Sequence, residues 1–144
     1  MIRYATAGDI PAVEDLLRLM HAEIGMAPPD EEKARAVVAR CFDRGTGAVL
    51  VACAEDGAIV GTLGMVFDQF WYTTAWHLQE MWTFVHPDHR RSTHAKDLLL
   101  NALETARKVK VPFVAAVFTD QRTEGKRRLF ARYLPQVGAI FKGD

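Results

Sequence analysis

The stretch VHPDHRRSTHAKDLL, from Val85 to Leu99, joins the end of an apolar run, a basic turn and the start of a helical pattern. Pro87 ends the pairing of a strand because proline has no N–H to donate. The helix that begins next leaves its first backbone N–H groups without partners inside the helix, and its dipole adds partial positive charge there. We therefore expect a strand, a tight turn and a helix N-terminus suited to hold phosphate.

Polar and basic side chains favour this interpretation of the turn. Arg90, Arg91 and Lys96 add positive charge, and Ser92 and Thr93 add hydroxyl donors. Basic residues at a helix N-terminus are unfavourable with respect to the dipole, by roughly 0.3–1 kcal/mol at an exposed site, so their presence needs an explanation. A bound pyrophosphate is one explanation, and a set of ordinary solvated charges is the other.

Length and composition predict one globular domain, residues 1–144, with a core of its own. The formal net charge is zero. A protein that binds duplex nucleic acid more often carries a basic excess, so we expect no nucleic-acid partner. No apolar run is long enough to cross a membrane, and the first residues lack the pattern of a signal peptide. We expect Cys41 and Cys53 in the core and the protein in the cytoplasm.

Hydrophobic periodicity predicts a mixed α/β fold, with helices on both faces of the sheet and the element order β-α-α-β-β-β-α-β-α-β. Asp56-Gly57 predicts a two-residue hairpin turn, and Gly61 and Gly64 indicate a bulge or a close approach of two chains. The apolar run 111–118 predicts a strand that is covered on both faces. The expected strands cover residues 2–5, 48–55, 58–70, 76–85, 111–118 and 139–141, and the expected helices follow Asp9 and Asp30 and cover 93–108 and 123–134.

The motif Val85-x-Pro87-x-x-Arg90-x-x-x-x-Ala95-x-x-Leu98-Leu99 resembles the acetyl-CoA-binding motif of the GCN5-related N-acetyltransferases, the GNAT family. The core of that motif is Arg or Gln, two residues, Gly, one residue, then Gly or Ala; this chain has RRSTHA at residues 90–95. The opening ATAGD and the element order are also similar to the family, over essentially the whole chain. The run HPDHRRS further resembles acetyltransferase-like proteins of phages and prophages.

This resemblance implies acetyl-CoA as the co-substrate and direct attack by a primary amine in a ternary complex. It implies that the pantetheine arm pairs with the fourth strand at Thr83, Phe84 and Val85, where a backbone N–H polarises the thioester carbonyl. The basic last helix is implied to reach the 3′-phosphate or adenine end, and a solvated face is its alternative. The residues implied for the phosphates are Arg90, Arg91, Ser92, Thr93, His94, Ala95 and Lys96, and those for the 3′-phosphate or adenine end are Thr123 and Lys126.

The resemblance also implies a general base on the fourth strand. Glu80 is the only carboxylate there, and the family often keeps a Glu near this position. A shift of one residue in the count would turn Glu80 to the other face of the sheet. The alternative interpretation is a solvated or salt-bridged carboxylate, with a water chain as the base.

Two residues depart from the family pattern. Thr93 stands in the place of the central glycine, and a β-branched residue disfavours positive φ. Either this position is ordinary helical backbone and the Thr93 hydroxyl adds a donor, or cofactor binding is weakened. Phe130, after Leu129, stands where the family often has a Tyr that protonates the leaving thiolate. Tyr133 is the expected substitute one turn later, and a packed aromatic side chain is the alternative.

Aromatic residues crowd the third and fourth strands. We expect Trp71, Tyr72 and Trp76 to form the wall of an acceptor pocket or the surface of a homodimer. Three histidines lie near the motif, but we expect no metal site because no Cys is near and a turn separates them.

The expected function is an acetyl-CoA-dependent N-acetyltransferase that acts on a small-molecule or peptide amine. One alternative is a non-catalytic acyl-CoA-binding module on the same fold. A second is a phage-associated interaction protein whose basic turn contacts another protein.

Overall fold

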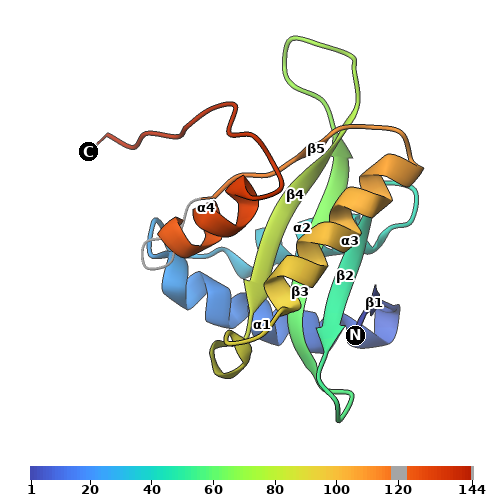
Figure 1. Ribbon diagram of the computed structural model, residues 1–144, viewed down its shortest axis with the longest axis vertical. Coiled ribbons are helices and arrows are strands. Elements are labelled where there is room, and N and C mark those ends of the chain that lie inside the picture. Colours follow the sequence, from blue (N-terminus) through green and yellow to red (C-terminus); the bar gives the residue numbers. More distant parts are fainter. Residues whose placement is uncertain (118–122, 144) are drawn as a thin grey trace.

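The computed structural model describes residues 1–117 and 123–143 of the chain. Two short 3-10 turns, η1 (Ala7–Asp9) and η2 (Pro87–His89), precede the first and third helices. The remaining elements, shown in Figure 1, are β1 (Ile2–Tyr4), α1 (Ile10–Ile24), α2 (Glu31–Phe42), β2 (Gly47–Cys53), β3 (Ile59–Asp68), β4 (His77–Val85), α3 (His94–Lys108), β5 (Phe113–Val114) and α4 (Thr123–Ala131).

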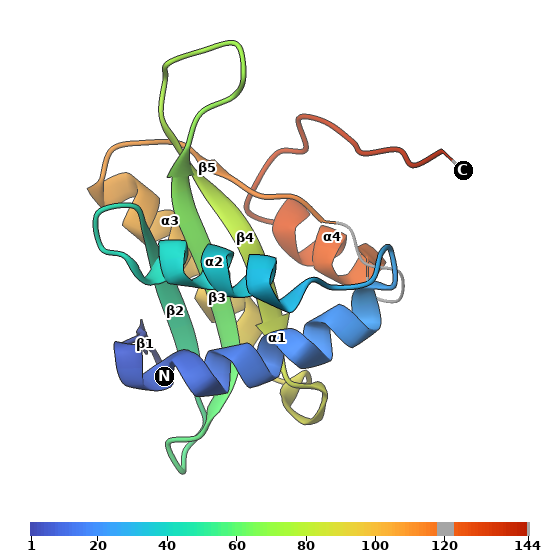
Figure 2. The same ribbon diagram turned by 180° about the vertical axis from the view of Figure 1, so that it is seen from behind.

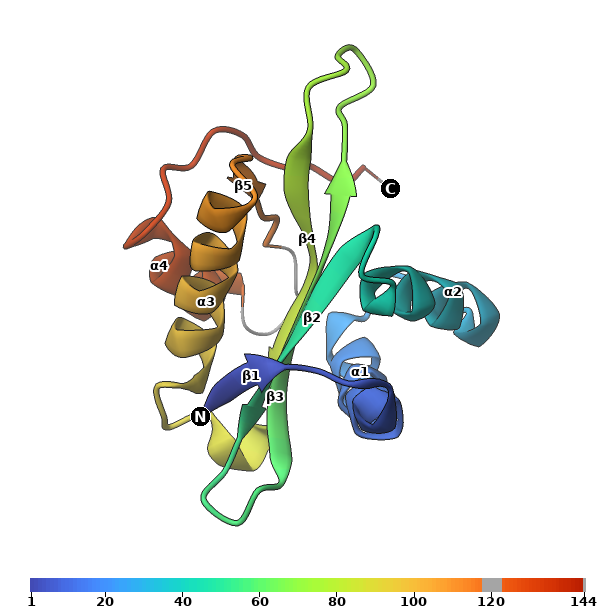
Figure 3. The same cartoon turned by 90° about the vertical axis from the view of Figure 1, so that its right-hand side faces the viewer.

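The strands form one sheet in the order β1-β2-β3-β4-β5. The first four strands pair antiparallel, and β5 runs parallel to β4. α1 and α2 lie on one face of this sheet, and α3 and α4 lie on the other (Figure 3). The expected mixed sheet with helices on both faces is therefore confirmed. Within the described ranges, no helix is both long enough and apolar enough to cross a membrane.

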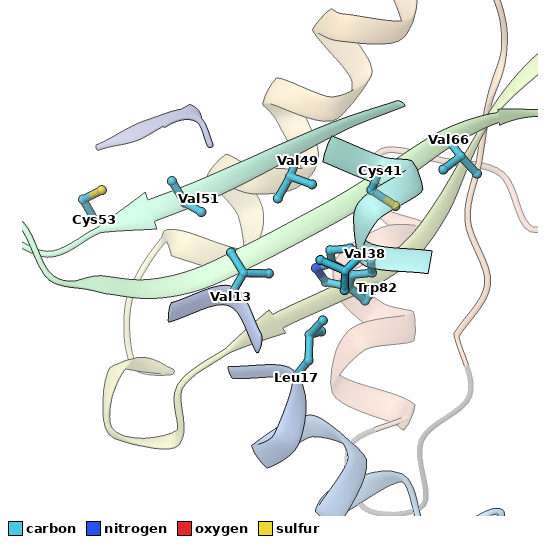
Figure 4. Close-up of a cluster of buried hydrophobic side chains, with 9 residues drawn as sticks. All are labelled: Val13, Leu17, Val38, Cys41, Val49, Val51, Cys53, Val66 and Trp82. Atoms are coloured by element: carbon cyan, nitrogen blue, oxygen red, sulfur yellow. The ribbon is translucent and has the colours of Figure 1, made fainter. Parts of the chain in front are cut away.

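The core consists of two apolar layers, one on each face of the sheet. Cys41 and Cys53 are free thiols buried in the layer under α1 and α2, as expected. Burial raises the pKa of the Cys41 thiol to about 12, so this group stays protonated and unreactive. Figure 4 shows this layer, which includes Val13, Leu17, Val38, Val51 and Trp82. The layer under α3 includes Leu50, Leu63, Met65, Leu98 and Ala102.

A β-bulge in β4 changes which side chains face which helices. Gly64 pairs with Trp82 and Met65 pairs with Glu80, so Met81 has no partner in β3. A Cβ on Gly64 would lie 2.3 Å from the indole ring of Trp82, which explains the glycine as a site of close approach. The bulge places Trp82 in the layer under α1 and α2, whereas Glu80 faces α4.

The hairpin between β2 and β3 has a longer turn than expected. The N–H of Ala54 donates to the carbonyl of Ala58, and the N–H of Gly57 donates to the carbonyl of Ala54. Gly57 has φ of 86°, which is the left-handed conformation of a three-residue loop closed by a bulge. The hairpin is confirmed, and the two-residue turn is wrong.

The C-terminal part departs most from expectation. Of the predicted strand 111–118, residues 111–117 are described, and among these only Phe113 and Val114 form a strand; both are half-buried, and their pairing with β4 ends at Gln79. The predicted strand 139–141 is wrong: Ile140 and Phe141 are 66% and 91% exposed in a segment that leaves the body of the molecule (Figure 2). Three apolar residues next to Gly138 offer too little pairing and burial to hold a strand.

Candidate active site

A cavity of about 760 Å³ opens beside β4, at the point where β4 and β5 separate. β5 pairs with β4 only at Leu78 and Gln79. Among the described residues, the part of β4 from Glu80 to Val85 therefore has no ladder partner on that side. The end of α1, the turn before α3, the start of α3 and one side of α4 complete the walls.

Backbone donors of β4 point into this opening. The N–H of His86 donates to the carbonyl of Val60 in β3, at 2.8 Å. Successive N–H groups of a strand point to opposite edges. The N–H groups of Thr83 and Val85 therefore face the open edge, where an extended ligand can pair with them as an added strand.

Most of the predicted site residues lie around this one cavity. Tyr133 does not line its described part and is 38% exposed, and the side chain of Thr123 lies outside the described residues. Arg91 and His94 belong to the turn and to α3 without lining the cavity. The predicted residues that do line it are Glu80, Thr83, Phe84, Val85, Arg90, Ser92, Thr93, Ala95, Lys96 and Lys126.

The aromatic residues predicted for the acceptor lie elsewhere. Trp71, Tyr72 and Trp76 are 97%, 69% and 55% exposed, on the loop between β3 and β4 that projects beyond the sheet (Figure 2). Phe70 stacks on Tyr72 with ring centroids 5.8 Å apart, so the loop carries an ordered aromatic cluster. None of these side chains lines the described part of the cavity.

Glu80 is the most deeply buried ionisable group at the cavity, at 5% exposure. Its Oε1 accepts hydrogen bonds from the hydroxyl of Thr83, at 2.7 Å, and from Nζ of Lys126, at 2.9 Å. Its Oε2 accepts from the N–H of Ala116 at 3.4 Å, across the gap where the β4–β5 ladder has ended. The carboxylate thus links β4 to α4 and to the segment after β5.

Lys126 is at the centre of this cluster. Sequence reasoning assigned it to the 3′-phosphate or adenine end of CoA, whereas its ammonium group lies against Glu80. The ammonium group also lies 5.2 Å from the ring centroid of Phe130, a distance suited to a cation–π contact. The spacing of three and four residues that places side chains on one helix face brings Lys126 and Phe130 together.

Arg90 is held by an acidic partner that the sequence did not indicate. Its Nη2 donates to both carboxylate oxygens of Glu23, at 2.7 and 2.8 Å, and its Nε donates to the carbonyl of Val85 at 3.0 Å. The guanidinium lies 5.1 Å from the ring centroid of Phe84. Glu23 lines the cavity from the last turn of α1, 67 residues away along the chain.

In the turn before α3, Thr93, which stands in the place of the family's glycine, has ordinary backbone geometry. Thr93 has φ of −90° and ψ of 0°, which a β-branched residue adopts without strain. Its hydroxyl donates to Oδ2 of Asp97 at 2.6 Å, and the hydroxyl of Ser92 donates to the carbonyl of His89 at 2.5 Å. The ordinary backbone at Thr93 is confirmed, and both hydroxyls have protein partners.

A ligand with an extended amide chain at one end and phosphates at the other suits these surroundings. The open edge of β4 offers backbone partners to an amide chain. The first-turn N–H groups of α3, with Lys96 and Arg90 beside them, offer donors and positive charge to phosphates. Asp97 and Glu23 offset part of that charge. Within the described part of the chain, no three His, Cys, Asp or Glu side chains gather closely enough to hold a metal ion.

The model of the acetyltransferase (GNAT) family matches residues 11–134. The chain belongs to the GNAT family. No curated protein matches it significantly. Solved structures of acetyltransferases align with nearly its whole length, at sequence identities so low that they show the fold alone. A protein from Clostridium acetobutylicum described as a predicted acetyltransferase with acetyl-CoA has a TM-score of 0.80 at 15% identity, with 99% of this chain and 94% of that chain covered.

Two further acetyltransferase structures show a similar fold. The ribosomal-protein-alanine N-acetyltransferase from Brucella melitensis biovar Abortus has a TM-score of 0.71 at 18% identity, with coverage of 100% and 99%. A GNAT family acetyltransferase from Staphylococcus aureus has a TM-score of 0.62 at 15% identity, with coverage of 99% and 97%. The expected family is therefore confirmed by the family match, and the expected fold by the structures.

Proposed function

We propose that this protein transfers the acetyl group of acetyl-CoA to a primary amine by direct attack in a ternary complex. One observation carries the proposal: a buried carboxylate, Glu80, lies in a large cavity directly beside the edge of β4 that no described strand pairs with. A base and an acyl-binding strand edge are the two parts that this chemistry requires.

The chain's own residues divide the work of binding. Acetyl-CoA, when bound, supplies an acetyl group activated as a thioester. The outward N–H groups of Thr83 and Val85 are suited to hold the amide chain and to donate to the carbonyl oxygen. The turn from Arg90 to Lys96 is suited to hold the phosphates. Thr123 remains a proposed contact of the 3′-phosphate or adenine end.

Glu80 is proposed as the general base. An amine arrives at neutral pH mostly as an ammonium ion and attacks only after it loses a proton. The hydroxyl of Thr83 and the N–H of Ala116 hold the carboxylate in one orientation at the cavity wall. This preorganisation keeps a proton acceptor ready where water is largely excluded.

The acceptor is proposed to be a small-molecule or peptide amine. The exposed loop with Trp71, Tyr72 and Trp76 lies outside the described cavity, so it suits the outer part of an extended acceptor or the surface of a homodimer. A cytoplasmic location fits the two free thiols.

A non-catalytic acyl-CoA-binding module is the second candidate. It is favoured by Phe130, whose side chain has no proton to donate, and by Tyr133, which does not line the described part of the cavity. Calorimetric titration with acetyl-CoA, CoA and dephospho-CoA, followed by a panel of amines, separates the candidates. Binding with turnover supports the enzyme, binding without turnover supports the module, and no binding contradicts both and leaves the phage-type interaction protein.

A further inference from the structure

Lys126 is a charged side chain at the cavity that binding and base catalysis leave without a role. Its side chain is 19% exposed and that of Glu80 is 3% exposed, and the two groups are in direct contact at 2.9 Å. The other charged side chains that line the described part of the cavity are Glu23, Asp68, Arg90, Lys96 and Arg132. Of all the charged side chains that line the described cavity, only Lys126 forms a described ion pair with Glu80.

The geometry points to Lys126 as the acid that protonates the CoA thiolate as it leaves. This inference rests on the proposed acetyl transfer and adds a residue to it. In the transfer, the new C–N bond and the breaking C–S bond share one carbon atom. If Glu80 reaches the attacking nitrogen, then Lys126, which is hydrogen-bonded to Glu80, lies within reach of the leaving sulfur, because both atoms are attached to the same carbon.

The protons balance along this contact. The acceptor enters as an ammonium ion and loses two protons to become an amide; one goes to solvent before attack and one goes to Glu80. The C–N bond forms while the C–S bond breaks, and the electron pair of the C–S bond leaves with sulfur. Lys126 gives a proton to that sulfur and regains one from Glu80 across the Nζ–Oε1 contact. The products are an amide and CoA thiol.

The neighbours of Lys126 agree with this role. Phe130 cannot donate a proton, but its ring makes a cation–π contact with the ammonium group of Lys126 at the cavity wall. Tyr133, the donor expected from the sequence, is off the described cavity wall. α4 therefore brings an ammonium group to the cavity instead of a phenol.

The decisive test measures the thiol of bound CoA rather than turnover. The far-ultraviolet absorbance of the thiolate, followed against pH with saturating CoA, reports how easily bound CoA ionises. A nearby ammonium stabilises a thiolate, so in Lys126→Met the midpoint of this titration should rise by about 1 pH unit. Lys126→Arg keeps the charge and should leave the midpoint near that of the wild type.

Turnover then separates charge from proton donation. Lys126→Met and Lys126→Arg should both lower kcat by about 100-fold, because a guanidinium does not release its proton at neutral pH. Arg128→Met is the matched control: this basic residue of α4 is 75% exposed at its side chain and should behave as wild type. The double variant Glu80→Gln/Lys126→Met leaves no unpaired buried charge, so its thiol midpoint, compared with that of Glu80→Gln, tests the inference if the single variant does not fold.

Each outcome is informative. An unchanged midpoint in Lys126→Met overturns the inference. A loss of the preference for CoA over dephospho-CoA in this variant also overturns it, because Lys126 would then hold the 3′-phosphate. If the wild type acetylates no amine, acetyl transfer fails, while the thiol titration still reports whether Lys126 lies at the sulfur.

Discussion

Glu80 and Trp82 are two residues apart on β4, yet they lie on opposite faces of the sheet. Regular strands place such residues on the same face. The extra residue, Met81, reverses this pattern, and the indole of Trp82 secures the reversal by filling the space over Gly64 and donating to the hydroxyl of Thr62 at 3.2 Å. A core tryptophan thereby turns the carboxylate of Glu80 into the cavity.

Replacement of Glu80 by Gln tests this carboxylate as the base. Gln has nearly the same shape but accepts no proton, so kcat should fall by about 10²- to 10⁴-fold. The affinity for acetyl-CoA should change little, because the binding groups lie on the backbone of β4 and on the turn. Steady-state kinetics and calorimetry measure the two effects. Glu55→Gln, on an exposed turn, is the control, and wild-type kcat in Glu80→Gln would assign the proton to water instead.

Replacement of Glu23 by Gln tests how Arg90 is used. Glu23 shares the guanidinium of Arg90 and adds negative charge where phosphates are expected. Its neutralisation should strengthen CoA binding by roughly five-fold, the equivalent of about 1 kcal/mol, and high salt should reduce the gain. Calorimetry at two salt concentrations measures this, with Glu14→Gln on the same helix as control. Unchanged or weaker binding would mean that Arg90 serves only to join α1 to the turn.

At the scale of secondary-structure elements, an ion pair between Arg3 and Asp9 joins the short strand β1 to the start of α1. Arg3 of β1 donates to both oxygens of Asp9, at 2.7 and 3.0 Å, and the N–H of Thr6 donates to Oδ2 at 2.7 Å. These donors, with Arg3 the largest cause, hold the pKa of the Asp9 carboxyl well below its usual range. Asp9 is also the N-cap residue of α1, so the ion pair with Arg3 fixes where this helix starts relative to β1.

The sign of the pH dependence follows from this lowered pKa. The folded state binds the Asp9 proton more weakly than the unfolded chain does, so the stabilisation is present above about pH 4 and is lost as pH falls toward the folded pKa. Urea unfolding of the wild type should weaken more between about pH 5 and pH 2 than that of Asp9→Asn. Asp15→Asn, at an exposed carboxylate, is the control, and equal pH slopes in Asp9→Asn and the wild type would contradict the assignment.

The elements also show where pattern alone predicts structure. α1, α3 and the three strands β2, β3 and β4 follow from periodicity, because each buries one face against the core over many residues. The run 111–118 is apolar enough for a long strand, but strand length depends on a partner, and the described pairing with β4 ends at Gln79. Nothing in the local sequence marks Met81 as the bulged residue, since the bulge depends on the fit between Trp82 and Gly64.

For the molecule as a whole, the cavity is built from parts that are distant in the chain. The turn from Val85 to Lys96 could be predicted because its donors are contiguous. The two ion pairs could not, since Glu23 lies 67 residues from Arg90 and Glu80 lies 46 residues from Lys126. Such pairs depend on how α1 and α4 close over β4, which is a property of the assembled fold.

Ligand binding should therefore be detected where the sheet is open. Saturation with CoA at about 100 times its Kd should raise the free energy of unfolding by about 2.7 kcal/mol. Hydrogen exchange should slow at the amides of Thr83 and Val85, which face the open edge, because a ligand paired with them removes their exposure. The amides of Leu50, Val51 and Ala52, where β2 has a strand on each side, should slow only as far as global stability requires. If CoA stabilises the protein without protecting the amides of Thr83 and Val85, the ligand binds elsewhere. The cavity of about 310 Å³ between α1 and α2 is then the site to examine.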